Sequence, residues 1–212
     1  MIAPWVSEQN TSRLCELLKA NGSDKSTNHN YDRVYQPIIN YLLFKSKQIT
    51  LAEIGLGTNN LDVLSNMGAS GTPGASCRSF RDFSPSINVY GADVDSRILF
   101  QEERIITQYV DQLQTSTIDQ FINVSNPDLL IDDGLHAFRA NLNVLNSFVS
   151  YAKKSKSEKW LIIEDLGFEV AQISCWLKIL TILEENCQFE SWVIKTMNSF
   201  FIVIRSPLCQ ES

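Results

Sequence analysis

The sequence predicts a single α/β domain built on a mostly parallel sheet of seven strands, with helices on both faces and a C-terminal hairpin that adds an antiparallel strand. Short apolar runs alternate with segments whose apolar residues recur at helical spacing, which is typical of β-α-β units. Several of these runs end in an acidic residue. The chain has 212 residues, which is long enough for one sizeable core.

Two amphipathic helices are expected before the first strand. Residues 7–20 carry Leu14, Leu17 and Leu18 on one face, and Asn21-Gly22 is a common helix end. A polar, turn-like stretch at residues 24–31 leads to a second helical stripe over residues 32–47.

The remaining elements alternate along the chain. The predicted strands are residues 48–55, 87–94, 105–111, 127–133, 160–165, 192–197 and 200–205. The predicted helices are residues 74–83, 96–103, 115–122, 137–151 and 169–185. Residues 61–73 form a loop with two glycines, and Asn198-Ser199 permits a tight turn in the final hairpin.

Composition excludes several classes of partner. The net charge is −6 and the longest basic cluster is the short run Lys153 to Lys156, so we expect no nucleic-acid partner. No apolar run reaches the ~18 residues needed to span a bilayer, and the first residues do not resemble a secretory signal. We therefore expect no membrane partner and a cytoplasmic location. Five cysteines, an odd number without metal-site spacing, are expected to be free thiols.

The turn after the first predicted strand reads Glu53-Ile-Gly55-Leu-Gly57-Thr58. Two glycines allow the backbone to approach a ligand closely, although glycines in a tight turn also serve geometry alone. The third glycine of a dinucleotide fingerprint is absent, which argues against a nicotinamide-dependent oxidoreductase. Glu53 would repel a pyrophosphate and suits a cationic ligand better.

Polar residues also end the next two predicted strands. Asp93 can accept hydrogen bonds from both hydroxyls of a ribose, and Asp111 and Gln112 are candidates to contact an adenine. The alternative for each aspartate, including Asp95, is a helix N-cap.

Two acidic pairs and a histidine follow the last parallel strands. Asp132-Asp133 precedes Gly134-Leu135-His136, and Glu164-Asp165 ends a buried run. Carboxylate oxygens favour Mg²⁺, Ca²⁺ or Mn²⁺, and a neutral imidazole can take a proton from a hydroxyl. The alternatives are solvated turn residues for Asp132 and Asp133, and an orienting role for His136.

Together these motifs resemble those of class I S-adenosylmethionine-dependent methyltransferases. In more detail, the chain resembles the macrocin-type sugar O-methyltransferases from Gly22 to Gly167. The resemblance is carried by Gly22-Ser23-Asp24-Lys25-Ser26-Thr27, Asn66-Met67-Gly68, Pro73-Gly74-Ala75-Ser76, Tyr90-Gly91-Ala92-Asp93-Val94-Asp95, Asp132-Asp133-Gly134-Leu135-His136 and Glu164-Asp165. Ser26 stands where the family usually has glycine.

The resemblance implies a Rossmann-like fold and a role for each candidate residue. The S-adenosylmethionine site would comprise Glu53, Gly55, Gly57, Thr58, Asp93, Asp111 and Gln112. A divalent cation such as Mg²⁺ would be held by Asp133, Glu164 and Asp165, with His136 as the catalytic base. Lys25, His29 and Tyr31 are candidates to cover the site or contact the substrate, so residues 1–47 would cover a core of residues 48–212.

The implied function is methylation of a sugar hydroxyl on a small acceptor such as a glycoside, and a homo-oligomer is among the assemblies allowed. Two alternatives remain open at this point. One is metal-dependent O-methylation of a catechol-like phenol. The other is a non-catalytic module that binds S-adenosylmethionine.

Overall fold

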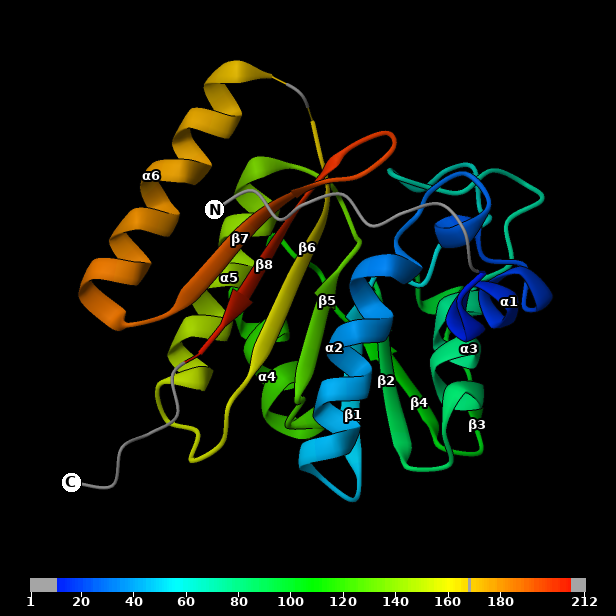
Figure 1. The fold of residues 1–212 in the computed structure, drawn as a ribbon. Coiled ribbons are helices and arrows are strands. Elements are labelled where there is room, and N and C mark those ends of the chain that lie inside the picture. Colours follow the sequence, from blue (N-terminus) through cyan, green and yellow to red (C-terminus); the bar gives the residue numbers. More distant parts are fainter. Residues whose placement is uncertain (1–10, 168, 207–212) are drawn as a thin grey trace.

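The computed structural model describes residues 11–167 and 169–206, which form a three-layered α/β fold around one sheet (Figure 1). Eight strands lie in the order β3-β4-β2-β1-β5-β6-β8-β7. Their bounds are β1 Ile49–Ile54, β2 Ile87–Asp93, β3 Gln101–Glu102, β4 Ile105–Tyr109, β5 Leu129–Asp132, β6 Trp160–Leu166, β7 Glu190–Lys195 and β8 Phe200–Arg205.

Five neighbouring strands, β4, β2, β1, β5 and β6, run parallel to one another. β8 inserts between β6 and β7 and pairs antiparallel with both, as expected for a C-terminal hairpin. All seven predicted strands are present, so the predicted α/β fold class is confirmed.

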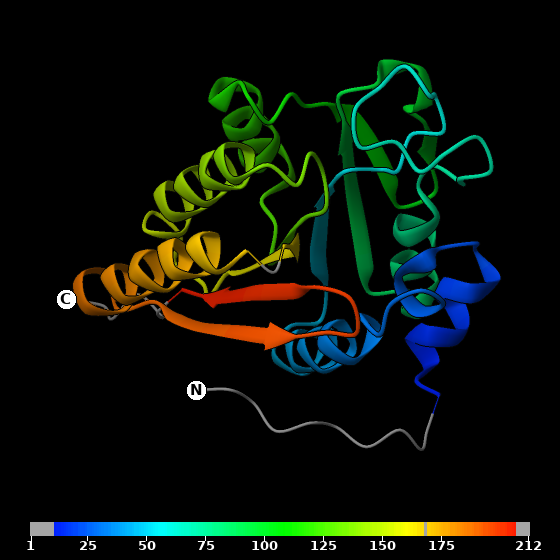
Figure 2. The same ribbon diagram turned by 90° about the horizontal axis from the view of Figure 1, so that it is seen from above.

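Helices cover both faces of the sheet (Figure 2). One core cluster joins α1, α2 and α3 to the sheet, and a second cluster joins α4, α5 and α6 to the other face. The helices are α1 Arg13–Ala20, α2 Asp32–Lys45, α3 Ala75–Phe83, α4 Thr115–Ser125, α5 Phe138–Ala152 and α6 Val170–Cys187. The strands alternate between the clusters: Leu51 and Ile131 belong to the first, Ala52 and Leu130 to the second. This is the period of two expected of a sheet buried on both sides.

The predicted helix over residues 96–103 is wrong. Only Ser96–Ile98 forms a short 3₁₀ helix (η2), and β3 then pairs antiparallel with β4. The guanidinium of Arg104 donates to three backbone carbonyl oxygens, those of Arg81, Ser84 and Ile87. These bonds hold Arg104 in a left-handed turn (φ 60°), so the chain reverses into a hairpin and does not continue as a helix.

The strand order reverses at the centre of the sheet, where β1 lies between β2 and β5. The register pairs Ile54 with both Ala92 and Asp132, and Asp132 with Ile163. The residues that follow these strands therefore meet at one edge. In open α/β sheets this carboxyl edge, at the reversal point, is where ligands bind.

Two further sequence expectations concern the described residues. Cys15, Cys77, Cys175 and Cys187 are free thiols as predicted, whereas Cys209 lies outside the described residues. Within residues 11–167 and 169–206, no helix is long and apolar enough to cross a membrane.

Two phenylalanines on helices test the assignment of the core. Phe148 of α5 is fully buried, whereas Phe44 of α2 is 88% exposed. We expect Phe148→Ala to lower the free energy of unfolding by about 3–5 kcal/mol, because it removes buried contacts and leaves a cavity. Phe44→Ala should change it by no more than about 0.5 kcal/mol. Urea unfolding followed by circular dichroism measures both, and equal losses would contradict the assignment.

Candidate active site

A cavity of about 730 Å³ opens at the carboxyl edge of the sheet. It is bounded by the ends of the parallel strands, by the loop that follows β1 and by the segment between α1 and α2. Except for Glu53, every predicted site residue lines this cavity: Lys25, His29, Tyr31, Gly55, Gly57, Thr58, Asp93, Asp111, Gln112, Asp133, His136, Glu164 and Asp165.

Both glycines after β1 have positive φ angles, and the packing of the chain itself requires the first of them. Gly55 has φ 103°, and a Cβ there would lie 2.0 Å from the backbone oxygen of Asp133. A Cβ on Gly57 would lie 2.2 Å from the sulfur of Met67, a residue of the following loop. Gly55 thus lets the ends of β1 and β5 approach each other closely, whatever ligand lies above them.

The carboxylate of Asp93 ends β2 and faces the cavity. Its two oxygens accept from the backbone N–H groups of Leu56 and Asp95, each at 2.8 Å. Burial raises the pKa of this carboxyl group, although the two backbone donors oppose the rise. A carboxylate has about four acceptor positions, so Asp93 keeps capacity for the hydroxyls of a ribose.

Asp95 is more important to the site than the sequence indicated. It accepts from Thr58 Oγ1 at 2.6 Å and from Asn60 Nδ2 at 2.7 Å, which ties the loop after β1 to the end of β2. Arg97 Nε donates to the same carboxylate at 2.7 Å and holds the pKa of Asp95 well below its usual range. Arg97 also pairs with Asp62 of that loop. The alternative prediction that Asp95 is a helix N-cap is confirmed, because its side chain caps the 3₁₀ helix η2.

Gln112 fixes the turn that follows β5. Its Nε2 donates to Asp132, while its Oε1 accepts from the backbone N–H of Leu135 at 2.6 Å. A Cβ on Gly134 would lie 2.1 Å from this Oε1, so the glycine makes room for the amide. Asp111 accepts from the backbone N–H of Leu113 in the turn before α4. Both residues line the cavity, and contact with an adenine stays a prediction.

A bulge in β6 turns Glu164 and Asp165 toward the same cavity. Successive residues of a regular strand point to opposite faces, yet both of these side chains line the cavity. The pairing of β6 with β8 shifts register between Ile163 and Leu166, and Asp165 adopts a left-handed conformation with φ 53°. Such bulges redirect side chains and occur next to active sites.

Lys25, in the 3₁₀ helix η1 Asp24–Ser26, reaches into a group of three carboxylates that we call the inner group: Glu53, Asp133 and Glu164. Its Nζ lies 2.9 Å from both oxygens of Glu164, hydrogen-bonds to Asp133 and lies 3.4 Å from Glu53 Oε1. Burial alone would lower the pKa of Lys25, but the three carboxylates hold it well above its usual value. Burial raises the pKa of Glu164 to about 7, against the opposing pull of Lys25.

Glu53 does not line the cavity. It is 1% exposed, and its Oε2 accepts from Ser76 Oγ and from Cys77 Sγ. Burial raises the pKa of its carboxyl group. Glu53 is therefore placed to act on the site through Lys25.

Tyr31, in the segment between α1 and α2, contacts Asp165, the acid that Lys25 does not reach. Its hydroxyl donates to Asp165 and lies 2.8 Å from Ser199 Oγ, at the turn between β7 and β8. The ring of His29 packs on that of Tyr31, with centroids 4.3 Å apart. Asn198 Nδ2 donates to the carbonyl of Asn28 at 2.7 Å, so the C-terminal hairpin holds the same segment.

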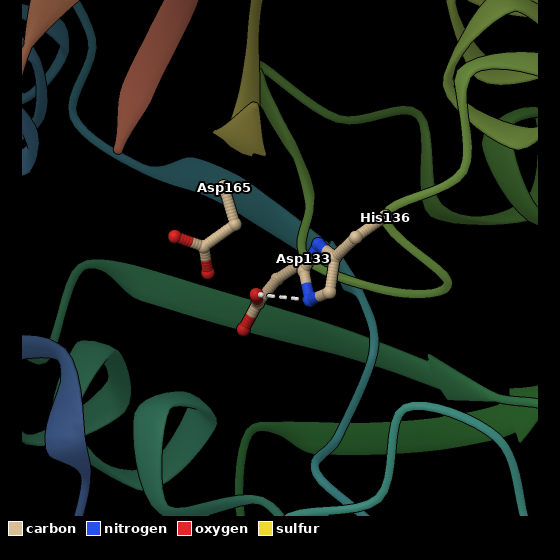
Figure 3. A group of neighbouring side chains, drawn as sticks. All are labelled: Asp133, His136 and Asp165. Atoms are coloured by element: carbon tan, nitrogen blue, oxygen red, sulfur yellow. Dashed lines mark ion pairs between the residues drawn. The ribbon is translucent and has the colours of Figure 1, made fainter. Parts of the chain in front are cut away.

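His136 and Asp165 lie on either side of Asp133 (Figure 3). The Nε2 atom of His136 is 3.7 Å from Asp133 Oδ1. His136 also adopts a left-handed conformation (φ 53°), which is strained for a residue with a side chain. Non-glycine residues in this conformation cluster at active sites.

Asp133 is shared between the inner group and an outer group, which consists of Asp133, His136 and Asp165. In each group the candidate ligand atoms lie within 4.8 Å of one another. The cation set implied by the resemblance, Asp133, Glu164 and Asp165, is thus divided between the two groups. Asp165 belongs to the outer one, whereas Glu164 faces Lys25.

The fold is similar to that of solved methyltransferase structures. MycE, the methyltransferase from the mycinamycin biosynthetic pathway, has a similar structure. Its complex with Mg and SAH matches with a TM-score of 0.66 and 19% identity over 96% of this chain and 57% of the MycE chain. Its complex with Mg, SAH and mycinamycin VI matches with a TM-score of 0.67 and 18% identity over the same shares.

The chain therefore spans little more than half the length of MycE. No protein-family model and no curated protein matches the sequence. At this identity the likeness concerns the fold, and it confirms the resemblance to class I methyltransferases at that level.

Two glycines with left-handed backbones test the approach of β1 to β5. Gly68 has φ 74° and open space around its Cα, so Gly68→Ala should cost no more than about 1–2 kcal/mol of backbone strain. Gly55→Ala adds a collision with the backbone of Asp133, and we expect a loss on the order of 3 kcal/mol or more. Thermal and urea unfolding measure the difference, and a Gly55→Ala protein as stable as Gly68→Ala would contradict the observed packing.

Proposed function

We propose that this protein is an S-adenosylmethionine-dependent O-methyltransferase that acts on a sugar hydroxyl of a small glycoside-like acceptor with the help of a divalent cation. One observation carries the proposal. A single cavity joins the glycine turn and Asp93 to the outer group Asp133, His136 and Asp165. The fold likeness to MycE, which has been crystallised with Mg, SAH and mycinamycin VI, supports it.

The cofactor end of the cavity would be the turn after β1. S-adenosylmethionine supplies the methyl group when it is bound. Gly55 and Gly57 leave backbone without side chains facing the cavity, and Asp93 accepts the ribose hydroxyls at the end of β2. Thr58 is held by Asp95 and keeps the loop in place.

The outer group has the chemistry of a cation site. Asp133 and Asp165 present carboxylate oxygens, the ligands that Mg²⁺ and Mn²⁺ prefer, and the ring of His136 lies beside Asp133. A divalent cation supplies positive charge that lowers the pKa of an oxygen bound to it. His136 would take the proton of the acceptor hydroxyl, and Asp133 beside it would orient the imidazole and stabilise its protonated form.

The acceptor end carries several polar side chains. Asp24, Lys25, the acid that follows β5 and the two acids near the end of β6 line it together with the rings of His29 and Tyr31. Hydroxyl groups of a sugar can pair with such donors and acceptors. This lining favours a sugar over a catechol-like phenol, which would be held chiefly by aromatic and apolar faces.

The cofactor assignment predicts binding of S-adenosylmethionine and S-adenosylhomocysteine in isothermal titration. Asp93→Asn keeps the size of the side chain but removes its charge and one acceptor. It should weaken binding by about 10–100-fold, the equivalent of one hydrogen bond to a charged group. Asp119→Asn, an exposed site on α4 away from this cavity, is the matched control and should leave affinity unchanged. Absence of binding by the folded wild-type protein would rule out the proposed function.

The role of His136 predicts a loss of turnover without a loss of binding. We choose His136→Asn because asparagine tolerates the left-handed backbone. Once an acceptor is found in a screen of sugars, kcat should fall by about 10²–10⁴-fold, the usual contribution of a general base. Affinity for S-adenosylhomocysteine and the Tm should remain close to wild type. Full turnover of this variant would show that His136 is not the base, and wild-type binding without turnover on any acceptor would favour the non-catalytic module.

A further inference from the structure

The inner group is built like a cation site, but it already contains a cation. Three buried or half-buried carboxylates, Glu53, Asp133 and Glu164, place oxygen atoms within 4.8 Å of one another. The ammonium of Lys25, which is 4% exposed, contacts all three. An ammonium has three donor hydrogens, so one such group can face three acceptors at once.

Glu53 provides a second, independent observation. Its Oε1 is buried and, among the described residues, accepts no hydrogen bond. This oxygen lies 3.4 Å from Lys25 Nζ, which makes it part of an ion pair but leaves its lone pairs unused. Buried polar atoms without a hydrogen-bond partner are rare, and one that faces a cation position indicates a ligand-type site.

We propose that Lys25 is the resident cation of the inner group and that its ammonium excludes divalent ions from Glu53, Asp133 and Glu164. A second cation there would share the same carboxylates and be repelled by the ammonium at short range. Divalent ions are thereby confined to the outer group, where Asp133 and Asp165 remain open to the cavity.

Lys25 also acts as a positioning residue. It belongs to the segment between α1 and α2, and its bonds to Asp133 and Glu164 fasten that segment to the ends of β5 and β6. A free metal ion would neutralise the same acids but would not hold the segment over the cavity. A lysine does both, since its charge is tethered to the chain.

The competing explanation is an ordinary structural ion pair, in which Lys25 adds stability and a divalent ion could not replace it. The chain offers a matched case of that kind. Lys159 is 3% exposed and pairs with the single carboxylate of Asp128 at 3.0 Å, away from the cavity. Loss of its charge leaves one acid and no group of ligands.

The test counts Mn²⁺ ions bound to the full-length chain, from the electron paramagnetic resonance signal of free Mn²⁺, in the absence of cofactor and acceptor. Lys25→Met removes the ammonium and keeps the length of the side chain. It should bind one Mn²⁺ per chain more than wild type. Its Tm should be lowered in EDTA and should recover in Mn²⁺ by more than the wild-type Tm rises. Lys159→Met should show neither the extra ion nor the rescue.

Two results would overturn the proposal: Lys25→Met that binds no more Mn²⁺ than wild type, or wild-type protein that already binds two ions at this cavity. If Lys25→Met does not fold with or without Mn²⁺, Lys25→Gln removes the same positive charge, keeps an amide that can donate to one of the acids and leaves all three carboxylates in place, so the same count decides. The inference rests on the proposed function in one respect only, the assignment of the outer group as the site of the divalent cation used in methyl transfer. A gain of Mn²⁺ together with no binding of S-adenosylhomocysteine would support the inference and reject the methyltransferase.

Discussion

Charge compensation at the carboxyl edge of the sheet is the constraint on which the rest of the site depends. Parallel strands bring Glu53, Asp133, Glu164 and Asp165 to one place, and carboxylates removed from water are destabilising unless they are paired. The single ammonium of Lys25 forms ion pairs with three of them, Glu53, Asp133 and Glu164. It follows that the segment between α1 and α2 does two things: it covers the cavity, and through Lys25 it supplies the positive charge that compensates the buried acids.

The shared position of Asp133 links the two halves of this arrangement. One of its oxygens faces Lys25, and the other lies near His136. Lys25 therefore compensates the charge of the inner acids, while the oxygens of the outer acids can still bind a ligand. Asp133 alone contacts both Lys25 of the covering segment and His136. This division explains how a cluster of acids can exist beside a buried cation and still offer oxygen ligands toward the cavity.

Much of the fold and of the site could be predicted from the sequence, because both depend on local patterns. The apolar run before Gly55 and the run that ends at Asp93 are strands in the structure, and the geometry of a parallel sheet places their ends together. The predicted site residues near the ends of the parallel strands line one cavity for this reason. The strained backbone at His136 also agrees with the functional interest of that residue.

The parts that escaped prediction depend on contacts between distant residues. Lys25 meets Glu164 across 139 positions, and no spacing rule relates them. The bulge at Asp165 is set by pairing with β8, and the hairpin at β3 is set by the contacts of Arg104 with three carbonyl oxygens. The sequence predicted Gln112 as a ligand contact, but its amide also fixes the turn at Gly134. This role could not be predicted, because Gln112 follows β4 whereas its partners Asp132 and Leu135 lie at the end of β5 and beyond it.

The contact between Tyr31 and Ser199 spans 168 positions, and Asn28 and Asn198 meet beside it. Contacts between residues so far apart in sequence close a long loop, which costs chain entropy. During synthesis the segment that covers the cavity emerges well before its partners in the β7–β8 turn. The site is therefore completed only after the β7–β8 turn has been made, and a chain that stops before this turn holds the acids of the sheet edge without the hairpin that secures their cover.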